Sequence, residues 1–244
     1  MNKVCPDCNN TRYIYEKDSN GFIISAKPCE ACKNDLAEMN LERKLIKSEI
    51  PLQYHSYTFE SYQGKDEFNN IKILKDFAEN IDNIKYRFIN LFLTGNKSCQ
   101  KTTMLCVMGK ELLKKNKEVK FVLAGDLIKL LMKDSGYGYD AEILKKINHY
   151  KMVDILLIDD IFDIMKSVYW SNSNNLVITE WDLFLRYRLS HGLRIITTSN
   201  FNLNQIKEKF GESIQSLFNR NFKELKFCDN IEKIAMSNIE KIFD

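Results

Sequence analysis

Residues 93–103 read Leu93-Thr94-Gly95-Asn96-Lys97-Ser98-Cys99-Gln100-Lys101-Thr102-Thr103 and directly follow the apolar run Phe88-Ile89-Asn90-Leu91-Phe92. A phosphate-binding loop has a glycine, four residues, a second glycine, a lysine and a serine or threonine, and it joins a strand to a helix. Gly95, Lys101 and Thr102 fit this pattern, whereas Gln100 stands where the second glycine is expected. The stretch therefore predicts a nucleoside triphosphate site in which a side chain replaces a residue that lets phosphate approach the backbone closely.

Strand and helix patterns alternate on both sides of this loop. Short, continuous apolar runs are typical of strands buried on both faces, and apolar residues at three- and four-residue spacing are typical of helices. The predicted strands are 88–94, 119–124, 155–158 and 194–198. The predicted helices are 68–81, 102–115, 126–133 and 178–190, with Asp126 as the N-cap of the third. This alternation predicts an α/β fold, a parallel sheet with helices on both faces.

Polar residues follow two of the predicted strands. Asp159 and Asp160 follow the strand 155–158, and Asn200 follows the strand 194–198. Parallel sheets bind ligands at the carboxyl ends of their strands, which places these side chains beside the loop. Asp159 is suited to bind Mg²⁺, Asp160 to orient or deprotonate the attacking water, and Asn200 to position that water. The alternatives are an Asp-Asp helix cap and an ordinary turn asparagine.

The loop itself supplies the phosphate contacts. Its backbone N–H groups and the following helix N-terminus would face the β-phosphate, Lys101 would neutralise β- and γ-phosphate oxygens, and the Thr102 hydroxyl would bind Mg²⁺. Cys99 is a candidate reactive thiol without a required catalytic role. The predicted nucleotide and magnesium contacts are Gly95, Asn96, Lys97, Ser98, Cys99, Gln100, Lys101, Thr102, Thr103 and Asp159.

Two Cys-x-x-Cys pairs, Cys5 with Cys8 and Cys29 with Cys32, lie near the N-terminus. Four thiolates at this spacing suit tetrahedral Zn²⁺, and they leave no open position for catalysis. The segments 12–15 and 22–24 resemble short strands joined by a hairpin turn at 18–21. Residues 1–33 are therefore predicted to form a structural zinc ribbon, with redox chemistry and free thiols as the alternatives.

Composition limits the remaining possibilities. The chain has 244 residues, 44% of them hydrophobic, which is enough for one large domain and a small appendage. The net charge of +3 does not by itself indicate a nucleic-acid partner. No segment has the length of a membrane span and no signal sequence is present, so a cytoplasmic protein without a membrane partner is expected. The predicted domains are a ribbon at 1–33, a connecting helix and linker at 34–66, and an ATPase core at 67–244.

The chain resembles the AAA+ helicase-loader family, the DnaC, DnaI and IstB-like group, and especially its phage members. The resemblance starts with the cysteine ribbon and the linker Ile50-Pro51-Leu52-Gln53-Tyr54, and it continues through Thr58-Phe59-Glu60-Ser61-Tyr62. Residues 95–102 match the Walker A loop, 153–160 the Walker B strand, and 195–203 the sensor-1 strand with its asparagine. Residues 207–216 resemble the stretch that leads to the arginine finger.

The resemblance implies an AAA+ P-loop ATPase that uses ATP and Mg²⁺ to deliver a DnaB-type replicative helicase to single-stranded DNA. It also implies that the ribbon region grips the helicase and that the ATPase cores self-associate. Ser213 and Leu217 stand where the family carries arginines, so Arg220, about one helical turn further on, is the candidate finger. Residues 228–244 are too few for a full helical lid, which is expected to be reduced or absent.

With Gln100, Ser213 and Leu217 departing from the family pattern, we expect ATP binding with slow hydrolysis. One alternative is a helicase adaptor that binds nucleotide without significant turnover. Another is an IstB-like transposition regulator that acts on duplex DNA. The abundance of Asn and Lys suits an AT-rich genome and suggests a phage origin.

Overall fold

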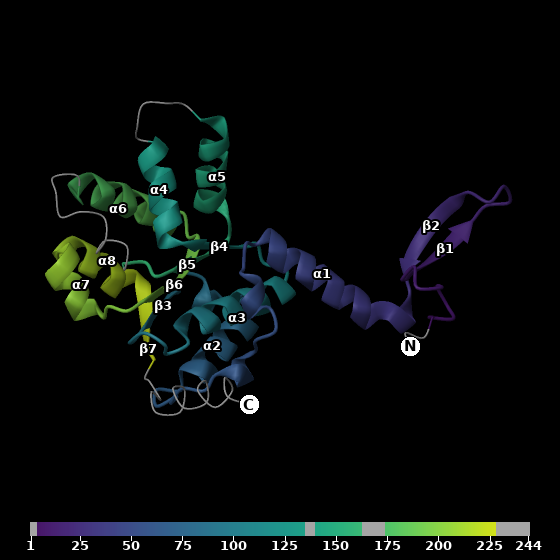
Figure 1. Cartoon of the computed structure of the whole chain (residues 1–244), viewed down its shortest axis with the longest axis horizontal. Coiled ribbons are helices and arrows are strands. Elements are labelled where there is room, and N and C mark those ends of the chain that lie inside the picture. Colours follow the sequence, from purple (N-terminus) through teal and green to yellow (C-terminus); the bar gives the residue numbers. More distant parts are fainter. Residues whose placement is uncertain (1–3, 135–139, 163–173, 228–244) are drawn as a thin grey trace, which may run out of the picture. The chain divides into compact units, whose positions relative to one another are not determined.

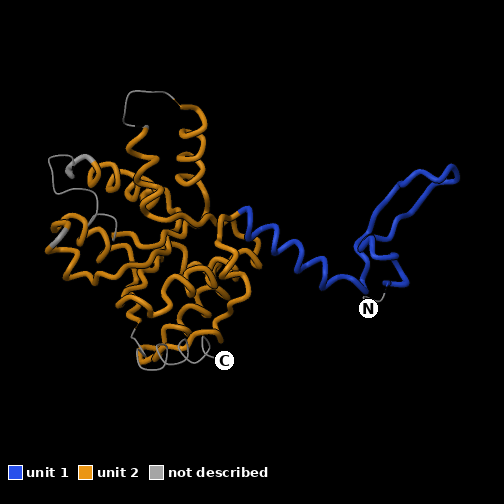
Figure 2. The backbone as a smooth tube through the Cα atoms, viewed as in Figure 1, with its two compact units in different colours: residues 1–47 blue, residues 48–244 orange. Residues whose placement is uncertain are grey.

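The computed structural model of the chain describes residues 4–134, 140–162 and 174–227. The chain forms two compact units, residues 1–47 and residues 48–244 (Figure 2). The first unit contains the cysteine ribbon together with the helix that follows it, and the second contains the linker and the parallel sheet. The division into three domains at 33 and 66 stays a prediction.

The first unit begins with an antiparallel hairpin. Strands β1 (Tyr13–Lys17) and β2 (Ile23–Pro28) pair with Tyr13 opposite Pro28 and Tyr15 opposite Ala26. Asp18 stabilises the turn, because its Oδ1 accepts hydrogen bonds from the backbone N–H groups of Asn20 (2.9 Å) and Phe22 (2.8 Å). A 3-10 turn, η1 (Glu30–Cys32), leads into helix α1 (Lys33–Lys47). The hairpin and the helix after it agree with the prediction from sequence.

The second unit is built on a five-stranded, all-parallel sheet in the order β4-β5-β6-β3-β7. Its strands are β3 (Asn90–Thr94), β4 (Val119–Leu123), β5 (Ile155–Asp159), β6 (Arg194–Ser199) and β7 (Phe222–Lys226). All residues of β3 and β5 are buried, as their continuous apolar sequences predict. Strand β7 was not predicted, and it lies at one edge of the sheet.

Helices cover both faces of this sheet (Figure 1). The linker contains the 3-10 turns η2 (Leu52–Tyr54) and η3 (Phe59–Ser61), and η4 (Ile84–Tyr86) precedes β3. One face packs against α3 (Lys101–Lys114), beside which lies α2 (Asn70–Glu79). A single apolar core on the other face joins α4 (Ala124–Asp134), α5 (Ala141–Met152), α6 (Asn174–Ser190), α7 (Leu203–Phe210) and α8 (Glu212–Asn221). The predicted α/β architecture is confirmed.

Gly109 of α3 packs closely against side chains of the second unit. A Cβ at position 109 would lie 2.5 Å from Leu157 Cδ1 and 2.9 Å from Ile50 Cδ1. Real Cβ atoms do not approach other atoms so closely, so with a side chain at 109 the ends of these two side chains would have to move.

Two predictions from sequence concern the start of α4 and the helical lid. Asp126 does not cap α4, because the helix begins at Ala124 directly after β4; Asp126 lies in the first helical turn, where its charge favours the helix dipole. The expected reduction of the helical lid concerns residues 228–244, which lie outside the described residues. Within the described ranges, no helix is long and apolar enough to cross a membrane.

Candidate nucleotide and metal sites

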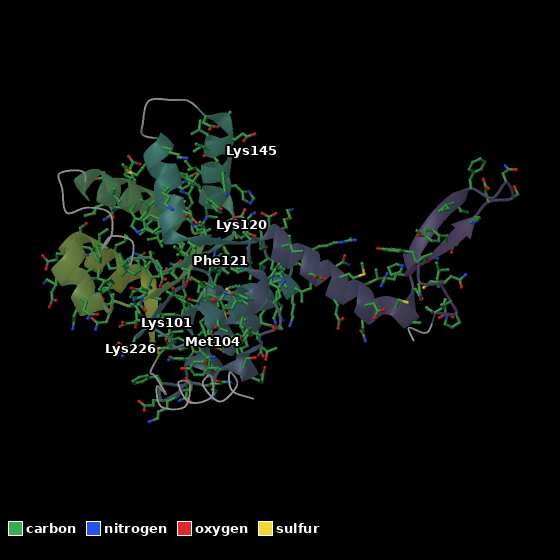
Figure 3. The ribbon with its side chains drawn as sticks, in the orientation of Figure 1. Lys101, Met104, Lys120, Phe121, Lys145 and Lys226 are labelled. Atoms are coloured by element: carbon green, nitrogen blue, oxygen red, sulfur yellow. The ribbon has the colours of Figure 1, made fainter. Side chains whose placement is uncertain are left out.

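Lys101 is the first residue of α3 (Figure 3). Its hydrogen bonds connect the phosphate loop to the residue that follows β6. Its Nζ donates hydrogen bonds to the Gly95 carbonyl oxygen at 2.9 Å and to Asn200 Oδ1 at 3.0 Å. A third bond goes to the Asn96 carbonyl oxygen. The side chain is buried by these contacts. The structure thus brings the loop lysine and the predicted sensor asparagine together.

Asp159, the last residue of β5, faces the start of α3. The Thr102 hydroxyl donates to Asp159 Oδ1 at 2.9 Å, and the Thr198 hydroxyl donates to the same oxygen at 2.6 Å. Burial raises the pKa of Asp159 above its ordinary value, while the hydrogen bonds from Thr198 and Thr102 and the charge of Lys101 act in the opposite direction. A carboxylate beside a hydroxyl offers the hard oxygen ligands that Mg²⁺ requires.

A cavity of about 410 Å³ lies over the phosphate loop. Its lining residues are Tyr54, Lys97, Ser98, Cys99, Gln100, Lys101, Thr102, Thr103, Asp160 and Asn200. Its size is within the range of small-molecule sites. Gly95 forms part of the loop, and a Cβ there would lie 2.2 Å from the Phe227 carbonyl oxygen, so no larger residue fits. The cavity, the positively charged Lys101 and the oxygen atoms of Thr102 and Asp159 fit a nucleoside triphosphate with Mg²⁺.

Gln100 adopts a left-handed backbone conformation, which glycine favours. Its φ of 58° and ψ of 22° lie in the left-handed region, which costs a residue with a side chain about 1–2 kcal/mol. Its side-chain Oε1 accepts a hydrogen bond from the backbone N–H of Gln63 at 2.7 Å. The amide is therefore bonded to the linker, and the loop keeps the turn that the phosphate-binding pattern requires.

Gln100→Gly is expected to leave the affinity for ATP within about 2-fold of that of the parent chain. The Gln100 amide is bonded to the linker, so its removal should leave the loop's contacts with phosphate unchanged. The stability should also change little, because the relief of left-handed strain, about 1 kcal/mol, offsets the loss of one hydrogen bond of similar size. Titration with a fluorescent ATP analogue measures the affinity, and thermal unfolding measures the stability. Gln100→Ala is the matched control, because it keeps the strain, loses the bond and should be the least stable of the three. A tenfold gain in affinity with glycine, about 1.4 kcal/mol, would show that the glutamine obstructs the site.

The other predicted loop and catalytic residues differ in exposure. Asn96, Lys97 and Ser98 are exposed, whereas Thr103 is buried. Cys99 is also buried, and its sulfur lies 2.9 Å from the Asn96 carbonyl oxygen, so the exposure expected of a reactive thiol is missing. Asp160 lines the cavity with a left-handed backbone, φ 55°.

Arg220 is not among the residues that line this cavity. It is exposed in the last turn of α8, while Leu217 is buried in the core. Arg186 on α6 donates a hydrogen bond to Ser213 Oγ at 3.3 Å and forms an ion pair with Asp182. Arg186 thus lies beside Ser213, a position where the family resemblance implies an arginine. Arg186 was not identified from the sequence.

Three residues at the site were missed by the interpretation of the sequence. Tyr54 in η2 lines the cavity, Gln63 bonds Gln100, and Thr198 bonds Asp159. Tyr54 and Gln63 are in or beside the linker that carries part of the family resemblance. Their place in this linker could have indicated that they belong to the site. For Thr198 the signal was a hydroxyl residue two positions before Asn200, at the end of a buried strand.

The four N-terminal cysteines form a compact cluster within the first unit. Their sulfur atoms lie within 4.8 Å of one another, with 3.9 Å between Cys5 and Cys29 and 3.6 Å between Cys8 and Cys32. Tetrahedral zinc with Zn–S bonds of about 2.3 Å separates its sulfur ligands by about 3.8 Å. Backbone N–H groups of Asp7 and Cys8 lower the pKa of Cys5 to about 7, whereas burial raises the pKa of Cys29 and the contact with Cys5 raises the pKa of Cys32, so the sulfur geometry is what indicates a metal site. The cluster therefore fits Zn²⁺.

The sequence model of a family described as IstB-like ATP binding protein matches residues 33–218. The chain belongs to this IstB-like family. Its members' description as ATP-binding agrees with the Lys101 and Asp159 geometry, and the match starts after the four cysteines. The cysteine cluster is therefore an addition outside the matched region of this IstB-like protein.

Solved structures share the fold of this IstB-like protein. A DnaC helicase loader has 19% identity and a TM-score of 0.59 over 72% of this chain and 99% of that one. A DnaI structure has 19% identity and a TM-score of 0.57 over 73% of this chain and 94% of that one. AMPPCP-bound DnaA from Aquifex aeolicus has 20% identity and a TM-score of 0.55 over 71% of this chain and 50% of that one. The chain thus spans about half the length of the DnaA structure, and these similarities confirm the predicted fold.

Proposed function

We propose that this IstB-like protein is an ATP-dependent loader that delivers a DnaB-type replicative helicase to single-stranded DNA. The observation that carries the proposal is the meeting of Lys101 of α3, Asp159 of β5 and Asn200, which directly follows β6, at the carboxyl ends of the parallel strands. Parallel sheets of this kind bind ligands at that end of their strands. The fold similarity to a DnaC helicase loader supports the choice of a helicase as the cargo.

The residues of the site divide the work of nucleotide binding and hydrolysis. Lys101 would exchange its bonds to the loop carbonyls for phosphate oxygens, and Thr102 and Asp159 would hold Mg²⁺, which would neutralise phosphate charge. Asp160, which lines the cavity, would orient the attacking water, and Asn200, which contacts the lysine, would help to position that water.

Hydrolysis is proposed to be slow in a single chain and faster after self-association. Arg220 does not line the cavity of its own chain but is exposed, so it is free to approach the nucleotide of a neighbouring copy. Such an arginine supplied in trans stabilises the charge of the transition state. Ser213 and Leu217, in place of arginines, favour a second candidate function, a helicase adaptor with little turnover. ATPase activity with and without single-stranded DNA distinguishes the two.

The hairpin of the first unit carries the proposed helicase contact. Its exposed apolar side chains are Tyr13, Ile14, Tyr15, Phe22, Ile23 and Ile24. Contiguous exposed apolar residues mark interaction sites. Glu16 pairs with Lys27 at 2.8 Å on the same hairpin, so its charges partly cancel. An apolar and electrically balanced surface suits a protein partner better than a phosphate backbone.

The double variant Phe22→Ser, Ile24→Glu is expected to weaken binding to a purified DnaB-type helicase at least 10-fold, because buried apolar anchors dominate interface energies. Interferometry with the intact protein measures the dissociation constant. The matched control is Ile84→Glu, since Ile84 is 76% exposed but belongs to the second unit. Equal weakening by both changes would argue against the hairpin as the contact. If the parent chain does not bind the helicase at all, the loader proposal is wrong.

A further inference from the structure

We propose that Thr198 is a positioning residue whose hydroxyl holds the Asp159 carboxylate in the geometry needed for magnesium and also fixes the backbone of Asp160. This inference rests on the proposed nucleotide site and adds a residue to it. Thr198 itself touches neither the cavity nor, by this assignment, the metal; it acts through its two neighbours.

A single hydroxyl group makes both contacts. Thr198 Oγ1 donates its hydrogen to Asp159 Oδ1 at 2.6 Å and accepts a hydrogen bond from the backbone N–H of Asp160 at 2.9 Å. The Thr198 carbonyl oxygen accepts a further bond from the Ile161 N–H at 2.9 Å. The residue is fully buried. Three consecutive residues, the last of β5 and the two that follow it, are thus fixed to one residue of β6.

These bonds extend the sheet beyond its regular pairing. The last registered pair between β5 and β6 is Ile158 with Thr197. One position further along, where the registered pairing of β5 and β6 has ended, the Thr198 side chain bonds Asp159 and the Asp160 N–H. The chain turns sharply there, because Asp160 has a φ of 55°, a conformation that residues with side chains adopt only when their surroundings hold them. The bond from the Asp160 N–H to Thr198 supplies part of this hold.

The adjacent hydroxyl groups have other roles. Thr197 Oγ1 donates to the Ile158 carbonyl oxygen at 2.7 Å, and Ser199 Oγ accepts from the Phe201 N–H at 2.9 Å. The Thr197 and Ser199 hydroxyl groups therefore bond main-chain groups, whereas the Thr198 hydroxyl bonds a carboxylate. Thr197 is equally buried, so it provides a comparison within the same strand.

Magnesium binding makes the Thr198 bond more important. The Thr102 hydroxyl, which bonds Asp159 here, would itself be a metal ligand, so it would not be an outer support of the carboxylate. The bond from Thr198 is outside the expected metal sphere and can persist. Partners of this kind fix the orientation of a metal-binding carboxylate, and their loss typically costs about 10–100-fold in metal affinity or activity.

The test is the magnesium requirement of nucleotide binding in the intact protein. Thr198→Val keeps the shape of the side chain and removes the hydroxyl. We expect the Mg²⁺ concentration for half-maximal binding of a fluorescent ATP analogue to rise about 10-fold or more, and the affinity measured in EDTA to stay unchanged. Thr198→Ser restores the hydroxyl and should bring the requirement back to within about 3-fold of the parent value. Thermal unfolding identifies a variant that has failed to fold.

Thr197→Val is the matched control, because it removes a buried hydroxyl one residue away that does not bond Asp159. An unchanged magnesium requirement in folded Thr198→Val would overturn the inference. So would an equal rise in Thr197→Val, or a failure of serine to restore the parent value. If the parent chain binds no nucleotide with or without Mg²⁺, the nucleotide site itself is refuted, and Thr198 has nothing to position.

Discussion

Lys101→Ala is expected to lower the affinity for ATP with Mg²⁺ by about 100-fold. Hydrogen bonds to a charged group contribute about 1.5–3 kcal/mol, and the upper part of this range corresponds to two orders of magnitude. The substitution also leaves the carbonyl oxygens of Gly95 and Asn96 without the donor that now holds them, so the loop loses its internal support as well. Titration with a fluorescent ATP analogue at a fixed Mg²⁺ concentration measures the change.

Lys97→Ala is the control for this substitution. Lys97 belongs to the same loop and lines the same cavity, but its side chain is exposed. Exposed ion pairs contribute about 0–1 kcal/mol, so its removal should cost no more than about 5-fold in affinity. Equal losses in the two variants would indicate general attraction of phosphate to a basic loop. An unchanged affinity in Lys101→Ala would refute the assignment of the loop as the nucleotide site.

The central strands were predictable because burial on both faces leaves a direct trace in the sequence. Ile155-Leu156-Leu157-Ile158 has no polar residue, and any strand of this kind has to be covered by helices. Strand β7 gives no such trace, since Phe222-Lys223-Glu224-Leu225-Lys226 alternates and includes three charged residues. Its place at the sheet edge leaves two of these side chains exposed. Helix α5 was missed for a related reason, because lysines interrupt its apolar stripe at Lys145 and Lys146.

The candidate site was predictable at the level of strand ends, but its individual contacts were not. The sequence places Lys101, Asp159 and Asn200 after three strands, and topology then brings them together. The direction of the Gln100 side chain depends on Gln63, which belongs to the linker. The need for glycine at 95 depends on the Phe227 carbonyl oxygen, far along the chain. Such contacts between distant segments follow from packing, which local sequence patterns do not specify.

The first unit is expected to lose its structure when the four-cysteine cluster cannot bind metal. The described part of the first unit, residues 4–47, contains one two-stranded hairpin, a 3-10 turn and one helix, and a lone hairpin is marginally stable at best. Among the buried residues of the ribbon are three of its cysteines, which form a small cluster of their own. Zinc binding contributes about 10–16 kcal/mol in small domains of this type, far more than so little buried apolar surface can supply.

Cys29→Ser removes a sulfur that is fully buried at the centre of this cluster. We expect zinc content measured by mass spectrometry to fall from about one ion per chain to a small fraction of that, and the hairpin to become sensitive to protease. The second unit should keep its thermal transition, because its core is separate. Cys106→Ala is the control, since Cys106 is buried on α3 outside the cluster and should leave the zinc content unchanged. A hairpin that stays protected without zinc would mean that thiol packing alone holds the ribbon, and the metal assignment would fail.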